Sequence, residues 1–141
     1  MSSPFRTQRR VEFRDPDAAG IMHFSAFFRM MEEVEHEFPR SLGASVVTRD
    51  NEGVVSWPRV HADCDYTGAV RFEEVLDIEP RVEPLGRSSA AYAFAFTAGD
   101  RPIATGRINV VRCRVEPPRP LRSIPISDEL RQRFAPYVET P

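Results

Sequence analysis

Apolar residues recur at helical spacing over residues 24–42, and this pattern predicts one long helix. Glutamates fill many of the positions between them, Ser25 is the expected N-cap, and Gly43 is a natural end. Because the apolar stripe is wide and largely aromatic, we expect the helix to pack against a broad surface such as a sheet. The stripe consists of Phe24, Phe27, Phe28, Met31, Val34, Phe38 and Leu42.

The other elements are predicted to be mostly strands, because apolar and polar residues alternate along them. Polar loops, glycines and prolines separate these runs, and a short helix is expected at 127–135. One long helix with strands in series predicts an α+β fold in a single domain covering 1–141. The expected strands cover 6–14, 54–66, 72–84, 88–98 and 102–115.

Charge and cysteine content narrow the function classes. The formal net charge is -2, so the composition lacks the excess of basic residues that is typical of nucleic-acid-binding proteins. No run of about 18 apolar residues is present, so no membrane span is expected. Residues 1–10 lack the apolar segment of a signal peptide. Cys64 and Cys113 lie far apart and are expected to be reduced thiols in a cytoplasmic protein.

Several common sites are absent from the sequence. There is no G-x-S-x-G elbow, no phosphate-binding P-loop, and no paired zinc-ligand spacing among the histidines and cysteines. Asp15 and Asp17 resemble the start of a calcium loop, but Ala19 cannot supply the next oxygen ligand. We therefore expect neither a metal nor a separate cofactor.

The loop DPDAAG at 15–20 runs directly into the predicted helix. The free N–H groups of a helix's first turn, together with its dipole, can polarise a carbonyl oxygen and stabilise an oxyanion. Asp17 could then attack the carbonyl carbon or activate a water. The spacing alone favours a simpler interpretation, in which Asp15 and Asp17 bond their own backbone in a turn.

The stretch QRRVEFRDPDAAGIMHFSAFFRMMEEVEHEF, residues 8–38, resembles the 4-hydroxybenzoyl-CoA thioesterase family of hotdog-fold proteins. The likeness extends over roughly residues 6–115. It implies an antiparallel sheet wrapped around one long central helix, and hydrolysis of an aryl- or acyl-CoA thioester. It also implies a homodimer or a tetramer of dimers with active sites at the subunit interface. Coenzyme A would be part of the substrate.

The resemblance also implies site residues. The family's catalytic aspartate falls on Asp17, and its carbonyl-polarising helix amide falls near His23 and Phe24. Family members carry Tyr or Trp around this helix start, whereas this chain has His23 and Phe24. The resemblance therefore does not identify the acyl group of the substrate. Implied substrate contacts are the loop glycine Gly20, the acidic Glu32, and Arg87, Ser88 and Ser89 near the coenzyme A phosphates, while Trp57 either walls the acyl pocket or simply packs.

Two alternatives remain at this point: a hotdog dehydratase or hydratase, and a non-catalytic acyl-CoA-binding subunit. Hydratases of this fold usually need a histidine, but the histidines other than His23 have simpler interpretations. His61 is expected on a polar strand face with Arg59, Asp63 and Asp65. A solvated helix face is expected for His36 and for three neighbouring glutamates, Glu33, Glu35 and Glu37.

Overall fold

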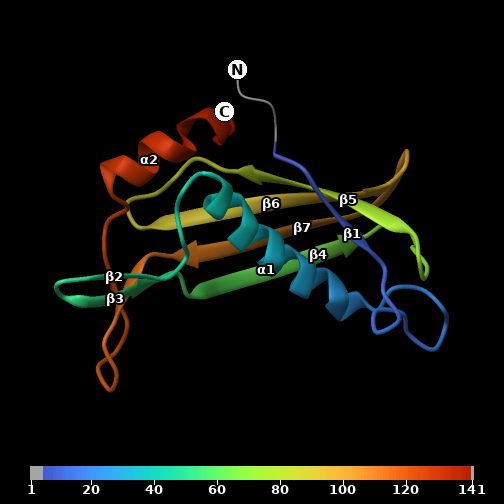
Figure 1. Ribbon diagram of the computed structural model, residues 1–141, viewed down its shortest axis with the longest axis horizontal. Helices are drawn as coiled ribbons and strands as arrows, with labels where there is room; N and C mark the ends of the chain where they lie inside the picture. The colour runs from blue at the N-terminus through green and yellow to red at the C-terminus, as the bar shows by residue number, and fades with distance from the viewer. Residues whose placement is uncertain (1–4, 141) are drawn as a thin grey trace.

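The computed structural model describes residues 5–140. Helix α1 (Phe24–Ser41) lies along one face of a five-stranded antiparallel sheet with the strand order β1-β5-β6-β7-β4 (Figure 1). The α+β class and the antiparallel pairing expected from the sequence are therefore confirmed. The five strands are β1 (Thr7–Arg10), β4 (Arg59–Tyr66), β5 (Val75–Val82), β6 (Ser89–Ala98) and β7 (Arg101–Val111).

A second sheet and a second helix lie near the C-terminal end of α1. The sheet has the order β2-β3-β8-β9, and helix α2 is followed by a 3-10 turn at Ala135–Tyr137. Residues 5–140 thus form two sheets where one was expected, while α2 confirms the short helix predicted at 127–135. The additional elements are β2 (Thr48–Asp50), β3 (Gly53–Ser56), β8 (Cys113–Val115), β9 (Arg122–Ser123) and α2 (Asp128–Phe134).

Two of the predicted strands, 54–66 and 102–115, are each divided between the two sheets. Pro58 lies at the first break and has no N–H for a ladder hydrogen bond, so β3 pairs with β8 while β4 pairs with β7. At the second break the Arg112 N–H leaves the ladder and donates to the Ser88 carbonyl at 2.7 Å. Alternating hydrophobicity continues across both breaks, which is why it did not reveal them.

Two further boundaries differ from the prediction. The strand expected at 6–14 ends at Arg10, because Val11 exchanges backbone hydrogen bonds with Glu73 and Glu74 in a loop. The segment from Thr48, predicted as a polar loop, forms the edge strand β2. Polar residues are common on such exposed edges, so composition alone could not separate this strand from a loop.

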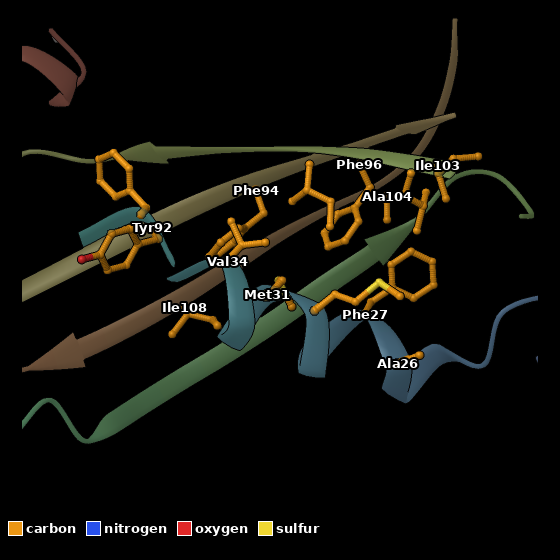
Figure 2. Close-up of a cluster of buried hydrophobic side chains, with 14 of the residues drawn as sticks. Ala26, Phe27, Met31, Val34, Tyr92, Phe94, Phe96, Ile103, Ala104 and Ile108 are labelled. Carbon is orange, nitrogen blue, oxygen red and sulfur yellow. The ribbon is translucent and has the colours of Figure 1, made fainter. Parts of the chain in front are cut away.

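The core lies between α1 and the five-stranded sheet, as Figure 2 shows. Phe27 stacks edge-on against Phe96 with ring centroids 5.2 Å apart, and Met31 and Val34 are fully buried beside it. A Cβ at Gly106 would lie 2.2 Å from the Met31 sulfur, so the missing side chain lets the helix approach β7 closely. Burial of each large apolar side chain contributes about 1.5–3 kcal/mol.

His23, not Ser25, is the N-cap of α1. Its Nδ1 accepts the Ser25 N–H at 3.2 Å and lies 2.7 Å from the Ser25 hydroxyl. Ser25 is thus inside the first turn, where its own amide needs an acceptor. The predicted end is confirmed, because α1 stops at Ser41 and Gly43 follows with φ +78°. No helix within residues 5–140 is both long and apolar enough to cross a membrane.

Candidate active site

Asp15 clamps the loop between β1 and α1. Its side chain is 2% exposed, and its two carboxylate oxygens accept the Glu12 N–H at 2.7 Å and the Arg29 guanidinium at 2.5 Å. Its backbone carbonyl accepts the His23 N–H at 2.7 Å. Asp15 therefore ties the loop to the second turn of α1 through Arg29 and to the helix start through His23. It acts as a structural residue of the loop.

Asp17 lies on the exposed side of the same loop. Its N–H donates to the Ile21 carbonyl at 2.8 Å, and its carbonyl accepts the Gly20 N–H at 3.0 Å, which closes a tight turn. One carboxylate oxygen accepts the Ala19 N–H at 2.7 Å. No donor among residues 5–140 reaches the second oxygen. Asp17 therefore bonds its own backbone, as the simpler interpretation expects, and still presents a free carboxylate oxygen to the surface.

Gly20 has φ +84°, a conformation that side chains of L-residues rarely adopt. A Cβ built there meets no heavy atom within 4 Å. The space beside the Gly20 backbone is therefore open among residues 5–140, and the substrate contact implied for Gly20 stays a prediction. The turn needs glycine for its backbone conformation, which in turn sets the direction of the Asp17 loop.

The first turn of α1 leaves one backbone donor free. The His23 N–H is taken by the Asp15 carbonyl, the Ser25 N–H by the His23 ring, and the Ala26 N–H by the His23 carbonyl at 3.0 Å. The Phe24 N–H has no acceptor in the part of the chain that the structure describes. At the positive end of the helix dipole, this amide is suited to bind a carbonyl oxygen or an oxyanion.

Tyr66, from the end of β4, also reaches the helix start and was not singled out from the sequence. Its hydroxyl donates to the Phe24 carbonyl at 3.0 Å, and its ring lies edge-on to Phe27 at 5.1 Å. Burial, followed by the nearby Cys64 thiol, raises the pKa of Tyr66 to about 12, so it stays a neutral donor. Strand alternation could indicate that Tyr66 faces the helix, but not that it reaches Phe24.

Exposed aromatic rings surround this loop. Phe13 is 88% exposed and meets Phe72 edge-on at 5.8 Å, while Phe24 at the helix start is 61% exposed. Phe72 is held beside the loop because the backbone of its neighbour Arg71 forms an isolated antiparallel β-bridge with Ile21. Large exposed apolar groups gathered near a carboxylate are typical of a ligand site or an interface.

Trp57 and the Arg87–Ser89 turn lie at the other end of the molecule from Asp17. Strand β6 begins at Ser89 near the C-terminal half of α1, where Tyr92 packs on Phe38, and reaches the helix start only at Phe96 (Figure 1). An 18-residue helix is about 27 Å long. Within one chain the structure therefore does not bring these predicted substrate contacts together with Asp17.

The details of these distant residues differ. Trp57 is 8% exposed and belongs to the hydrophobic core, which fits the packing interpretation. Arg87 is exposed, and its guanidinium forms no hydrogen bond or ion pair with residues 5–140. Its carbonyl is held by the Ile126 N–H at 2.8 Å, while the Ser88 carbonyl accepts from Arg112. Ser89, also exposed, begins β6.

Glu35, expected on a solvated helix face, is 1% exposed. Its carboxylate accepts the Arg59 guanidinium at 2.8 Å and lies 3.2 Å from the His36 ring. Burial raises the pKa of Glu35 to about 7, although Arg59 acts to lower it. Burial and then Arg59 lower the pKa of the His36 ring. Glu32, one turn earlier, is exposed and lies 3.9 Å from Arg59.

The prediction that Arg59 shares a polar strand face with His61 and Asp63 is wrong, and a β-bulge in β4 is the reason. The strand register shifts between Arg59 and His61, so Arg59 turns toward α1 while His61 and Asp63 point to the outer face. His61 and Asp63 pair there at 2.8 Å. A one-residue shift exchanges the two faces of a strand, and the sequence pattern gave no sign of this shift.

The β4 edge of the five-stranded sheet is open along the described chain. Strand β4 pairs with β7 on one side only, and Val60 and Tyr66 are 64% and 44% exposed. Exposed edges of this length invite pairing with another strand. The helix start and the Asp17 loop lie near the Tyr66 end of this edge. Within residues 5–140 no three side chains come together as a metal site.

Comparison with known proteins finds a family match and similar sequences. The family model of the thioesterase superfamily matches residues 19–115. A protein of Aquifex aeolicus named as an esterase is 31% identical over 113 residues, which cover 80% of this chain and 86% of that protein. The 1,4-dihydroxy-2-naphthoyl-CoA hydrolase of Synechococcus elongatus is 28% identical over 104 residues, covering 73% and 76%.

Solved structures share the fold. The 1,4-dihydroxy-2-naphthoyl-CoA thioesterase Slr0204 from Synechocystis superposes with a TM-score of 0.80 at 15% identity, covering 94% of this chain and 96% of that one. BH1999, a gentisyl-coenzyme A thioesterase, superposes with a TM-score of 0.76 at 26% identity, covering 91% and 98%. The matches extend over nearly the whole length of each chain.

Proposed function

Because the chain belongs to the thioesterase superfamily, we propose that it hydrolyses a coenzyme A thioester to a free acid and coenzyme A. One observation carries this proposal. A single loop presents the exposed carboxylate of Asp17 beside a helix start whose Phe24 N–H is free. Acyl transfer needs both groups: one to attack or activate water, the other to stabilise the oxyanion.

In the proposed reaction the thioester carbonyl oxygen binds the Phe24 N–H. Asp17 removes a proton from a water whose oxygen adds to the carbonyl carbon. The carbon–sulfur bond then breaks, and the proton passes to the leaving thiolate of coenzyme A. Alternatively, the Asp17 carboxylate attacks the carbonyl carbon directly, and the carbon–sulfur bond breaks to release the coenzyme A thiolate and leave an acyl anhydride. Water then hydrolyses the anhydride, which restores the Asp17 carboxylate, frees the acid and supplies the proton of the coenzyme A thiol. His23 caps the helix, so its proposed role is to hold the Phe24 amide in place.

We also propose that the working unit contains two copies paired through their β4 edges. An antiparallel pairing places the start of one β4 beside the end of the other. Trp57, which precedes β4, and Glu32, which lies beside Arg59 at the start of β4, would then approach the Asp17 loop of the second copy. Within one chain Trp57 lies at the far end of the molecule from that loop. Arg87, Ser88 and Ser89 are the proposed contacts for the coenzyme A phosphates. A monomer mass at micromolar concentration would contradict this assembly.

An aromatic acyl group is the favoured substrate. The exposed rings of Phe13, Phe24 and Phe72 support this choice, because aromatic rings stack well on one another. The relatives named for 1,4-dihydroxy-2-naphthoyl-CoA and gentisyl-coenzyme A also support it. The test is a panel of aromatic, branched and straight-chain thioesters with detection of the released thiol. Failure to release thiol from any of them would contradict the proposal.

A further inference from the structure

A cavity lies at the end of α1 that is remote from Asp17 in the same chain. Its volume is about 520 Å³, within the 300–1,000 Å³ typical of small-molecule sites. It is bounded by the last turn of α1, the loop that follows, the break between β7 and β8, and helix α2. Arg40, Arg112 and Arg133 line it, and Trp57 and Leu130 supply an apolar wall. The reaction steps proposed at Asp17 and Phe24 involve none of these arginines, although the proposed dimer brings Trp57 toward the Asp17 loop of the second copy.

The charge of the cavity is strongly positive. Its three arginines face a single carboxylate, Glu129, which already pairs with Arg133 at 2.8 Å. Arg133 also donates to the Gly43 carbonyl at 2.7 Å, so it is held in place. Neither Arg40 nor Arg112 forms an ion pair with any residue in the described range 5–140. Two guanidinium groups without an ion-pair partner among residues 5–140 therefore share one concave surface.

Arg112 is the most unusual of the three. One of its terminal nitrogens donates to the Pro125 carbonyl at 2.8 Å, but its Nε–H is buried without an acceptor. Burial and then the neighbouring Arg114 lower the pKa of Arg112. Buried donors are nearly always paired in folded proteins, because an unpaired one costs free energy. An anion in the cavity would compensate the charge of Arg112 and accept from its accessible terminal nitrogens.

We infer that this cavity binds a phosphomonoester dianion carried on a planar apolar body. Guanidinium groups match phosphate oxygens in geometry and charge, and a phosphomonoester carries nearly two negative charges at pH 7. The hydroxyls of Ser45, Thr48 and Ser127 add polar groups around it, while Trp57 and Leu130 would contact the apolar body. The inference does not depend on the proposed thioesterase activity.

The phosphate could belong to the coenzyme of a thioester or to a separate metabolite. Both offer the same chemistry to the cavity, a phosphomonoester close to a planar ring system. The distinction matters for function, because a separate metabolite would make the cavity a regulatory site. A competition experiment with free coenzyme A distinguishes the two sources.

Trp57 makes the test direct, because it is the only tryptophan of the chain and lines the cavity. Phenyl phosphate is titrated into the intact protein while Trp57 emission is recorded, and calorimetry follows the same titration. We expect saturable binding of phenyl phosphate and none of phenol at the same concentrations. Arg40→Met should weaken binding roughly tenfold, since one charged contact is lost. Arg40 is exposed, and its side chain forms no hydrogen bond or ion pair with residues 5–140 that the change would break.

Arg119→Met is the matched control, because Arg119 is exposed, lies outside the cavity and pairs with Glu116. It should bind phenyl phosphate as the parent does. Displacement of phenyl phosphate by coenzyme A would assign the site to the coenzyme, and its absence would assign it to a separate phosphomonoester. The inference is overturned if neither Trp57 emission nor heat reports binding at millimolar phenyl phosphate. It is also overturned if Arg40→Met binds phenyl phosphate as well as the control.

Discussion

Replacing the buried Glu35 by glutamine should change how stability depends on pH. In the unfolded chain the Glu35 carboxyl has its ordinary pKa of 4.5, whereas burial in the folded chain raises this pKa to about 7. Between these values the folded state holds a proton that the unfolded state has lost, so the free energy of unfolding falls as pH rises. Below about pH 4.5 the full stabilisation is present, and above about pH 7 it is lost.

The size of the effect follows from the two pKa values. At about 1.4 kcal/mol for each pH unit between them, Glu35 lowers the free energy of unfolding by about 3 kcal/mol across this window. The Glu35→Gln side chain has nearly the same shape but cannot ionise, so the free energy of unfolding of the variant should not fall in this way as the pH rises. Relative to the variant, the parent should therefore lose about 3 kcal/mol between pH 4.5 and pH 8.

Urea unfolding followed by Trp57 emission measures this difference, at fixed protein concentration so that any association stays constant. Glu37→Gln is a control of opposite sign. Burial acts to raise the pKa of Glu37, but hydrogen bonding to Arg9 outweighs it and lowers this pKa. The ionised Glu37 therefore stabilises the fold at higher pH, and this stabilisation is lost as the pH falls. Parallel stability curves for the parent and Glu35→Gln would refute the reasoning, because they would mean that Glu35 ionises equally in both states.

Three further changes separate structural roles from substrate contacts. Asp15→Asn should cost about 1–3 kcal/mol in urea unfolding, because the charged partner of Arg29 is lost, while the turnover of the folded enzyme stays near that of the parent. Gly20→Ala should lower stability by about 1–2 kcal/mol through backbone strain alone; weaker substrate binding with unchanged stability would instead reveal a close approach. Arg87→Ala should raise KM without lowering kcat, and less so at high salt; a fall in kcat at fixed KM would exclude a phosphate contact.

The sequence predicted helix α1 and the loop before it well, because both depend on local signals. The apolar stripe has helical spacing over five turns, and the turn residues of 15–20 act within their own loop. Asp15 was correctly expected to be structural. Its clamp to Arg29 could not be foreseen, since many exposed helix arginines look alike in sequence.

Features that depend on distant pairing were missed. Glu35 looks like any other glutamate of its acidic run, and it is buried only because a bulge turns Arg59 toward the helix. Tyr66 reaches the Phe24 carbonyl from a strand more than 40 residues away. The separation of Trp57 and Arg87 from Asp17 depends on which end of β6 meets the helix start. Periodicity predicts elements and faces, but not which ends of the elements meet.

The most direct test of the proposed mechanism is the turnover of Asp17→Asn on a thioester that the parent cleaves well. The change keeps the size and the backbone turn but removes the negative charge and the basicity of the side chain. With the Phe24 N–H intact, substrate should still bind, so kcat should fall by roughly 10²–10⁴ with KM little changed. Near-native turnover of Asp17→Asn, with Asp15→Asn measured beside it, would contradict the role given to Asp17.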